Sequence, residues 1–360
     1  MQEALELAKQ GAYGTPPNPR VGALLLRKGE IVGRGFHRQA GGPHAEIMAL
    51  ASAGERARGA TLYVTLEPCC HHGRTPPCTE AIIAAGVERV VVAMEDPNPL
   101  VAGQGIQRLQ EAGIQVSLLP LGPELRFLNR GFLQRMRLGR PWIQVKQASS
   151  LDGKTALASG ESQWLTGSAA REDVQEERAK ASAILVGVGT ILADDPRLAP
   201  RLAHPLVRHP VKIVLDGHAR TPTHAALLQS PGETWIIHTP AADPGQIHNL
   251  EAAGARLLEL SPSETGAGVD WGGLMRLLAQ AEMNEILVEA GGRLASSLLN
   301  AHLVDEYLLY LAPLFLGKDA RASAEPGPYA CLSDIPRWQL WECRALGPDV
   351  KLRYFREELR

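Results

Sequence analysis

Residues 67–78 read EPCCHHGRTPPC, and residues 43–46, earlier in the chain, read PHAE. The first segment ends the apolar run Thr61–Leu66, which predicts a β-strand. The second segment opens the run Ala45–Ala51, which predicts a helix. The sequence therefore places one histidine and several cysteines where elements of an α/β fold begin and end.

His44, Cys69 and Cys78 form a candidate three-ligand zinc set. Imidazole and thiolate ligands suit Zn²⁺. Three protein ligands leave the fourth tetrahedral position to water, which is typical of a catalytic rather than a structural zinc. Zinc lowers the pKa of such a water towards neutrality. We therefore expect a hydrolytic zinc site.

Glu46 is the candidate catalytic residue, because it is not needed as a ligand and can carry protons between the water, a ring nitrogen and a leaving amine. His-x-Glu followed by Pro-Cys-x-x-Cys is typical of zinc deaminases. The chain matches the first half and the Pro-Cys, but eight residues rather than two separate Cys69 from Cys78. Residues two apart on a helix do not share a face, so the role of Glu46 depends on the pattern and not on spacing.

A closed structural zinc remains an alternative at this point. In that case Cys70, His71 or His72 would supply a fourth ligand. The chain would then be a binding scaffold, and Glu46 would have no evident purpose.

Composition indicates a globular protein with two domains. The chain has 360 residues, 45% of them hydrophobic and 21% charged, and a net charge of −2. That charge lacks the basic excess of nucleic-acid-binding proteins, so we expect no nucleic-acid partner. Three of the five cysteines cluster, which argues for metal binding in a reducing compartment rather than for disulfides.

The chain start predicts an amphipathic helix over residues 1–9 rather than a secretory signal. No apolar run is long enough to span a bilayer. We therefore expect a cytoplasmic protein without a membrane partner. The oligomeric state stays open, with a homo-oligomer as one option.

Strand-like and helix-like runs alternate along the whole chain, which predicts α/β architecture in both halves. A polar connector is expected near 135–141. The predicted strands of the two halves are Val21–Leu26, Thr61–Leu66, Val90–Met94, Ile114–Leu118, Trp142–Gln147, Ala183–Val188, Val211–Leu215, Thr234–His238, Glu285–Glu289, Leu303–Leu311 and Val350–Phe355. Besides Ala45–Ala51, the predicted helices are Thr79–Ala85, Gly105–Ala112, Ala169–Ala181 and Leu274–Ala281.

The first half resembles the deaminase half of the bacterial bifunctional riboflavin-biosynthesis enzymes. The resemblance rests on PNPRVG (17–22), GRGFH (33–37), the segment 67–78, DPNP (96–99) and VAGQG (101–105). It implies a cytidine-deaminase-like α/β/α domain over residues 1–138, with Asn18 and Arg74 binding substrate. His37 is a weaker candidate for a substrate contact.

Glycine turns follow two predicted strands of the second half, at residues 187–190 and 289–293. A glycine turn at a helix N-terminus can bind an anion, because its amides and the helix dipole point at the same place. Such turns are also common for purely structural reasons.

The second half resembles the reductase half of the same enzymes, which is related to dihydrofolate reductase in fold and uses NADPH. The resemblance rests on ASSLDGK (148–154), GESQW (160–164), GVGT (187–190), ADDPRL (193–198) and EAGG (289–292). It implies a dihydrofolate-reductase-like α/β domain over residues 141–360. The implied cofactor contacts are Ala148, Trp164, Thr190, Asp194, Gly217, Gly291, Gly292, Arg293, Leu294, Ala295, Ser296 and Ser297. The implied substrate contacts are Ser162, Arg178, Leu198, Arg201 and Glu289.

The resemblance implies two consecutive reactions on a small pyrimidine ribosyl phosphate. The 2-amino group of 2,5-diamino-6-(5-phospho-ribosylamino)pyrimidin-4-one is hydrolysed, and the ribosyl group of the product is then reduced to ribityl with NADPH. Lys146, Lys154 and Asp194 are candidates for proton transfer in the reduction, and Arg178 and Arg201 suit phosphate recognition. The alternative is a nucleoside or tRNA deaminase with a non-catalytic C-terminal domain. Near-neutral charge and the glycine turns of the second half argue against it.

Overall fold

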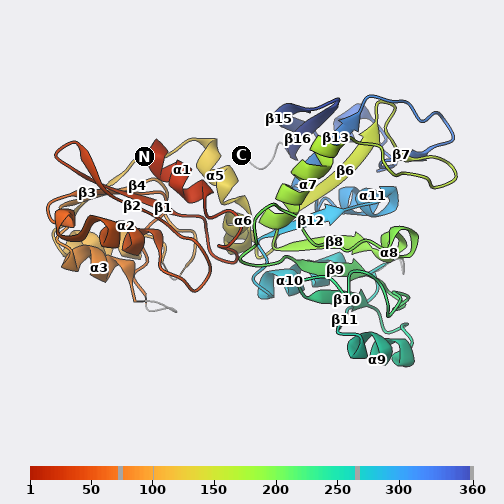
Figure 1. Cartoon of the computed structure of the whole chain (residues 1–360), viewed down its shortest axis with the longest axis horizontal. Coiled ribbons are helices and arrows are strands. Elements are labelled where there is room, and N and C mark those ends of the chain that lie inside the picture. Colours follow the sequence, from red (N-terminus) through yellow and green to blue (C-terminus); the bar gives the residue numbers. More distant parts are fainter. Residues whose placement is uncertain (72–75, 100, 264–267, 357–360) are drawn as a thin grey trace. The chain divides into compact units, whose positions relative to one another are not determined.

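The computed structural model in Figure 1 describes residues 1–71, 76–99, 101–263 and 268–356. The chain divides into two compact units, Met1–Gly139 and Arg140–Arg360, and each has its own core. Within the described part of the chain, no helix has both the length and the apolar character needed to cross a lipid bilayer.

The first unit is a five-stranded sheet covered by helices (Figure 1), with strand order β2-β1-β3-β4-β5. Strand β1 pairs antiparallel with β2 and β3, whereas β3, β4 and β5 are parallel. The elements in chain order are α1 (Gln2–Lys9), β1 (Gly22–Arg27), β2 (Glu30–Phe36), α2 (Ala45–Ala53), η1 (Gly54–Ala57), β3 (Thr61–Val64), α3 (Cys78–Ala84), β4 (Arg89–Val92), α4 (Gln104–Glu111), β5 (Gln115–Leu118), α5 (Pro123–Leu128) and α6 (Arg130–Leu138).

Small residues bring α2 close to the sheet. A Cβ atom on Gly35 of β2 would lie 2.2 Å from the carbonyl oxygen of Ala45, and one on Gly33 would lie 2.3 Å from that of Ala49. Both alanines are fully buried in the core that α2 shares with β1 and β3. The start of α2, which carries His44 and Glu46, is therefore held at a fixed height above the sheet. These same glycines hide β2 in the sequence, since glycine weakens a strand pattern.

Helices α1 and α5 use a separate apolar cluster, in which Leu5 and Leu125 pack with Ala93. Alternate residues of the strands contribute to the larger cluster with α2, α3 and α4. Two helical layers with one sheet between them give the α/β/α arrangement expected for this half.

The second unit is built on a nine-stranded sheet with strand order β11-β10-β9-β8-β12-β6-β13-β16-β15. Strands β11 through β13 of that order run parallel, and β16 and β15 complete the sheet antiparallel. The elements in chain order are β6 (Trp142–Ser150), β7 (Lys154–Ala156), α7 (Ser168–Lys180), β8 (Ala183–Gly187), α8 (Val188–Asp194), β9 (Val211–Leu215), β10 (Thr234–His238), α9 (Pro244–Ala252), β11 (Arg256–Glu259), α10 (Trp271–Gln280), β12 (Glu285–Glu289), α11 (Gly292–Asn300), β13 (Glu306–Ala312), β14 (Arg321–Ala322), η2 (Leu332–Asp334), β15 (Trp338–Leu346) and β16 (Asp349–Arg356).

Both faces of the central parallel strands β8, β9, β10 and β12 are buried, as the continuous apolar runs of the sequence require. Leu185 of β8 faces the cluster with α10 and α11, and its neighbour Ile184 faces the cluster with α8 and α9. Helix α7 packs through Ala170 and Val174 against β13. Because these strands are parallel, their carboxyl ends lie at one edge of the sheet, and the loops that follow them lie together there.

The predicted α/β class is confirmed in both units, and three strands (β9, β10 and β12) have the predicted bounds. The polar connector near 135–141 was wrong in part, because Arg135 and Arg137 lie in the last turn of α6. Gly139 ends that helix with a positive φ of 64°. The sequence also missed β2, α5, β11 and β15, among others.

Candidate active sites

The three predicted zinc ligands converge in the first unit. The Nδ1 atom of His44 lies 3.2 Å from Cys78 Sγ and 3.6 Å from Cys69 Sγ. All three ligand atoms lie within 4.8 Å of one another. A tetrahedral zinc with ordinary bond lengths separates such atoms by about 3.5–3.8 Å, so the residues present fit the ion. These residues could hold zinc with one position open.

Two helix N-termini and the loop after β3 supply these ligands. His44 is the N-cap residue of α2, and Cys78 is the first residue of α3. The backbone N–H of Cys78 points to Cys69 Sγ at 3.4 Å. A helix N-terminus favours negative charge, so both thiol positions suit thiolates. The hydrogen bond with Cys78 lowers the pKa of Cys69 to about 4, whereas the same contact raises the pKa of Cys78.

Glu46 lies beside the ligands, which its spacing from His44 could not establish. Its side chain is only 4% exposed, and its carboxyl group lies near the thiol of Cys78. Burial raises the pKa of Glu46 to about 7, although the nearby His44 lowers it. A carboxyl group that can hold or release a proton near neutral pH is suited to proton transfer.

Asn18 and His37 form a pair next to this site. Nδ1 of His37 lies 3.0 Å from the carbonyl oxygen of Pro43, so that nitrogen carries the proton. Nε2 of His37 then accepts from the side-chain amide of Asn18, 3.0 Å away. Burial lowers the pKa of His37, which is consistent with a neutral ring. The ring lies edge-on to His44, with 5.3 Å between centroids.

The four-ligand alternative finds no fourth ligand in the described residues. Neither Cys70 nor His71 belongs to the group formed by the three ligands. His72, the remaining candidate, and Arg74, a predicted substrate contact, both lie outside the described residues.

A cleft in the second unit collects most of the predicted reductase residues. It lies at the carboxyl ends of the parallel strands β6, β12, β8 and β9, where open α/β sheets bind ligands. The predicted residues that line it are Ala148, Ser162, Trp164, Arg178, Thr190, Asp194, Leu198, Arg201, Glu289, Gly291, Gly292, Arg293 and Leu294.

The glycines of this cleft leave room over the backbone. A Cβ atom on Gly187, Gly189 or Gly291 would meet nothing within 4 Å, and their φ angles do not require glycine. Gly187 and Gly291 are the N-cap residues of α8 and α11. Phosphate groups can therefore approach exposed N–H groups there, so the residues fit a dinucleotide.

Four predicted cofactor residues lie away from the cleft lining. Gly217 is tied to Thr239, whose hydroxyl donates to its carbonyl oxygen at 2.8 Å. Ala295 is fully buried in the core. The hydroxyl of Ser296 donates to Gly292, and that of Ser297 accepts from the indole of Trp271.

Arg178 and Glu289 bind each other across the cleft wall. Nε and Nη2 of Arg178 donate to the two carboxylate oxygens of Glu289, at 2.5 and 2.8 Å. Burial alone would raise the pKa of Glu289, but Arg178 and then Lys146 outweigh it and lower that pKa to about 2. Burial also lowers the pKa of Lys146, which lines the same cleft.

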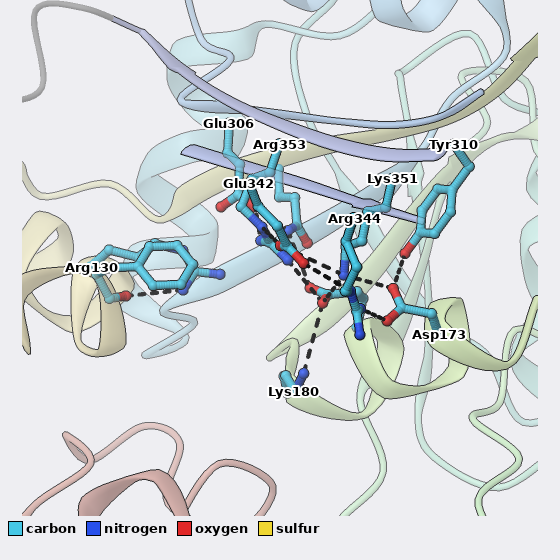
Figure 2. Close-up of polar contacts among 12 residues, drawn as sticks. Arg130, Asp173, Lys180, Glu306, Tyr310, Glu342, Arg344, Lys351 and Arg353 are labelled. Carbon is cyan, nitrogen blue, oxygen red and sulfur yellow. Dashed lines mark hydrogen bonds and ion pairs between the residues drawn. The ribbon is translucent and has the colours of Figure 1, made fainter. Parts of the chain in front are cut away.

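A buried ion-pair network anchors α7, the helix that carries Arg178 (Figure 2). Asp173 and Glu177 of α7 both pair with Lys351 of β16, at 2.6 and 3.0 Å. Arg353, also of β16, pairs with Glu177 at 2.9 Å and with Glu306 of β13. The sequence showed none of this, because its members lie far apart along the chain.

Sequence reasoning also overlooked Glu67, which precedes the ligand Cys69 by two residues. Its side chain is 3% exposed, and it accepts hydrogen bonds from the backbone of the segment that follows β4. Its one signal in the sequence is that a charged residue follows an apolar strand-like run and directly precedes Pro68-Cys69.

Comparison with known proteins gives a family match for each unit. Residues 141–352 match the family model described as the RibD C-terminal domain. Residues 1–94 match the model described as the cytidine and deoxycytidylate deaminase zinc-binding region. The two matches therefore cover the cleft and the zinc ligands.

Relatives span nearly the whole chain. The riboflavin biosynthesis protein RibD of Escherichia coli is 49% identical over 367 residues, with 98% of this chain and 97% of the relative covered. That of Bacillus amyloliquefaciens is 41% identical and covers 98% of this chain and 94% of the relative.

Solved structures agree. Acinetobacter baumannii RibD in its form 1 matches with a TM-score of 0.90 and 43% identity, over 99% of this chain and 97% of that chain. A diaminohydroxyphosphoribosylaminopyrimidine deaminase/5-amino-6-(5-phosphoribosylamino)uracil reductase from Thermotoga maritima matches with a TM-score of 0.84 and 33% identity, over 99% of this chain and 97% of that chain. These matches confirm the predicted folds and disfavour a deaminase with a non-catalytic second domain. The chain belongs to the RibD family of riboflavin biosynthesis proteins, with a zinc-binding deaminase domain followed by a reductase domain.

Proposed function

We propose that the chain catalyses two consecutive steps, one in each unit. Residues 1–138 hydrolyse the 2-amino group of 2,5-diamino-6-(5-phospho-ribosylamino)pyrimidin-4-one, which releases ammonia. Residues 141–360 then reduce the ribosyl side chain of 5-amino-6-(5-phosphoribosylamino)uracil to ribityl with NADPH. The observation that carries the proposal is the pairing of two separate sites in one chain: a metal-ligand group beside Glu46 and a glycine-lined cleft.

His44, Cys69 and Cys78 would hold the zinc, which supplies a Lewis acid that lowers the pKa of water towards neutrality. Glu46 takes up a proton from the attacking water and delivers it first to the pyrimidine ring nitrogen. Glu46 then takes the second proton from the hydroxyl group that the attack leaves on the ring carbon and passes it to the departing amino group, which leaves as ammonia as the carbonyl forms. Its buried carboxyl group beside the ligand Cys78 supports this role. Asn18, fixed by His37, offers its amide oxygen to the pyrimidine.

NADPH would supply the hydride for the second step. The exposed backbone at Gly187 and Gly291 supports binding of its pyrophosphate. Arg178 and Arg201 line the same cleft and can recognise the sugar phosphate. Lys146, Lys154 and Asp194 remain candidates for proton transfer to the opened sugar. We expect NADPH to be strongly preferred over NADH, and equal rates with both would contradict this choice.

Absorbance at the NADPH band tests the two-step function directly. The purified chain is given the diaminopyrimidine and NADPH, with or without a metal chelator. We expect NADPH to be consumed without chelator and spared with it, because reduction needs the deaminated product. NADPH consumption at the same rate with and without the chelator would contradict zinc-dependent deamination. No consumption with either the diaminopyrimidine or the aminouracil would contradict the reductase.

The five cysteines are all free thiols, three of them in the segment 69–78. Zinc binding through Cys69 and Cys78 requires reduced thiols. We therefore propose that the protein acts in the cytoplasm.

A further inference from the structure

We propose that Glu67 is a positioning residue of the deaminase site, whose carboxylate joins the segment carrying Cys69 to the segment 94–106. The proposal rests on the assignment of Cys69 as a metal ligand. Glu67 does not touch the reacting atoms; it acts through the position of Cys69.

The Glu67 carboxylate accepts four backbone hydrogen bonds, two at each oxygen. Oε2 accepts from the N–H groups of Asp96 and Gly103, at 3.1 and 2.9 Å. Oε1 accepts from those of Gly105 and Ile106, at 2.9 and 3.1 Å. All four donors lie 29 or more positions further along the chain, so one side chain binds two segments that are distant in the sequence.

Two of these donors belong to the first turn of α4, where N–H groups have no partner inside the helix. Gly103, the N-cap residue of α4, has no side chain to satisfy them. Glu67 therefore caps α4 from outside, with a charge that the helix N-terminus favours. Among the described residues, its hydrogen-bond partners are backbone groups rather than a cation.

Backbone contacts on both sides of Cys69 also fix the chain there. The N–H of Glu67 donates to the carbonyl oxygen of Met94, at 2.9 Å. Pro68 follows, and its carbonyl oxygen lies so close to α4 that a Cβ atom on Gly105 would be 2.0 Å from it. On the other side, the carbonyl oxygen of Cys69 accepts from Thr79 N at 3.2 Å. Cys69 is thus held between α4 and α3, with a single rigid proline separating it from the Glu67 carboxylate.

The arrangement requires two acceptor oxygens. Glu67→Gln keeps the size of the side chain but replaces one oxygen by an NH₂ group. That group would face two N–H donors and leave both unsatisfied in a buried place. Glu67→Asp keeps both oxygens but withdraws them by one methylene. Glu80→Gln is the matched control, because Glu80 also contacts α4, through Arg108 at 2.9 Å, on an exposed surface.

The test measures zinc in the full-length zinc-loaded chain during titration with a chelator of known affinity. We expect Glu67→Gln to lose zinc at a free-zinc concentration ~10–100-fold higher than the wild type, the range typical for residues that orient metal ligands. Glu67→Asp should fall between the two, and Glu80→Gln should match the wild type. Deaminase kcat should fall with zinc retention, whereas reduction of the aminouracil by the second unit should not change.

Wild-type zinc retention in Glu67→Gln would overturn the proposal. If Glu67→Gln prevents the first unit from folding, Glu67→Asp and Gly105→Ala decide. The latter leaves the carboxylate intact but pushes on Pro68, and it should also weaken zinc retention. Unchanged zinc binding in both of these variants would overturn the proposal. Cys69→Ser tests the ligand assignment itself: if this variant retains zinc, Cys69 is not a ligand, and the failure is not one of the role of Glu67 alone.

Discussion

Glu177 and Arg178 are consecutive residues of α7 that belong to two separate sets of ion pairs. Glu177 accepts from Lys351 and Arg353 of β16, at 3.0 and 2.9 Å. Arg178 instead forms its two-point pair with Glu289 at the cleft. Helix α7 is therefore fixed to the antiparallel part of the sheet by one residue and contributes to the cleft by the next.

We predict that Lys351→Met strongly destabilises the second unit. Lys351 is 1% exposed, and its removal leaves Asp173 and Glu177 with less positive charge in a buried place. Breaking a buried ion pair from one side costs about 3–5 kcal/mol. Urea unfolding followed by tryptophan fluorescence measures it, since all six tryptophans lie in residues 142–341.

Arg276→Met is the control for that variant. Arg276 lies 3.6 Å from Asp270, and its side chain is 70% exposed. Exposed pairs contribute about 0–1 kcal/mol. A Lys351→Met effect no larger than that of Arg276→Met would show that the network does not stabilise the unit.

We predict that Arg178→Lys weakens substrate binding in the reduction. Lysine keeps the charge but cannot form the two-point contact with Glu289 or with a phosphate. KM for the aminouracil should rise ~10-fold or more, the effect of losing one charge-assisted hydrogen bond. Steady-state reductase kinetics measure it, and an unchanged KM would remove Arg178 from phosphate recognition. Ammonia release by the first unit should stay at the wild-type rate.

The depressed pKa of Glu289 predicts acid sensitivity of the second unit. Its folded-state value of about 2 lies below the ordinary 4.5, so the unfolded chain binds a proton more readily between these values. The stabilisation is fully present above pH 4.5 and is lost as the pH falls towards 2. It amounts to about 3 kcal/mol. Glu289→Gln should start less stable at pH 6 but lose less stability down to pH 3, again by urea unfolding. Equal losses in both proteins would refute the pKa assignment.

The sequence predicted those elements whose pattern is local. Val211–Leu215, Thr234–His238 and Glu285–Glu289 are apolar runs buried on both faces, and the structure has strands with the same bounds. Strand β16 shows the opposite case. Its buried positions are Asp349, Lys351 and Arg353, because they face α7, whereas the apolar residues between them are less buried. An alternating pattern shows which residues share a face of the strand. It does not show which face is buried when the charged residues form ion pairs.

The candidate sites could be predicted to the same extent: compact sequence motifs were found, whereas contacts between distant residues were not. The ligands of the first unit came from a compact motif, and the structure places them together. Glu67 could not be assigned a role, because its partners are backbone N–H groups far along the chain that carry no sequence signal. Gly217 and Ala295 were expected at the cofactor from motif position alone, and neither is among the residues that line the cleft.

We predict that Cys78→Ser abolishes stable zinc binding, whereas Cys70→Ser does not. Cys78 is fully buried at the start of α3 and points to His44, whereas Cys70 lies outside the ligand group. Metal analysis of both purified variants measures it. Full zinc occupancy in Cys78→Ser would contradict the ligand set, and loss of zinc in Cys70→Ser would revive a four-ligand site.

Glu46→Gln shows whether the two active sites of this chain work independently. The variant keeps the size of the side chain and removes the proton carrier, which typically costs ~10²–10⁴-fold in rate. Zinc content, which reports on the first unit, and tryptophan fluorescence, which reports on the second, should both match the wild type. We expect the variant to release no ammonia from the diaminopyrimidine but to oxidise NADPH at the wild-type rate when given the deaminated aminouracil. Loss of both activities in a folded, zinc-loaded Glu46→Gln protein would contradict the division of this chain into two sites.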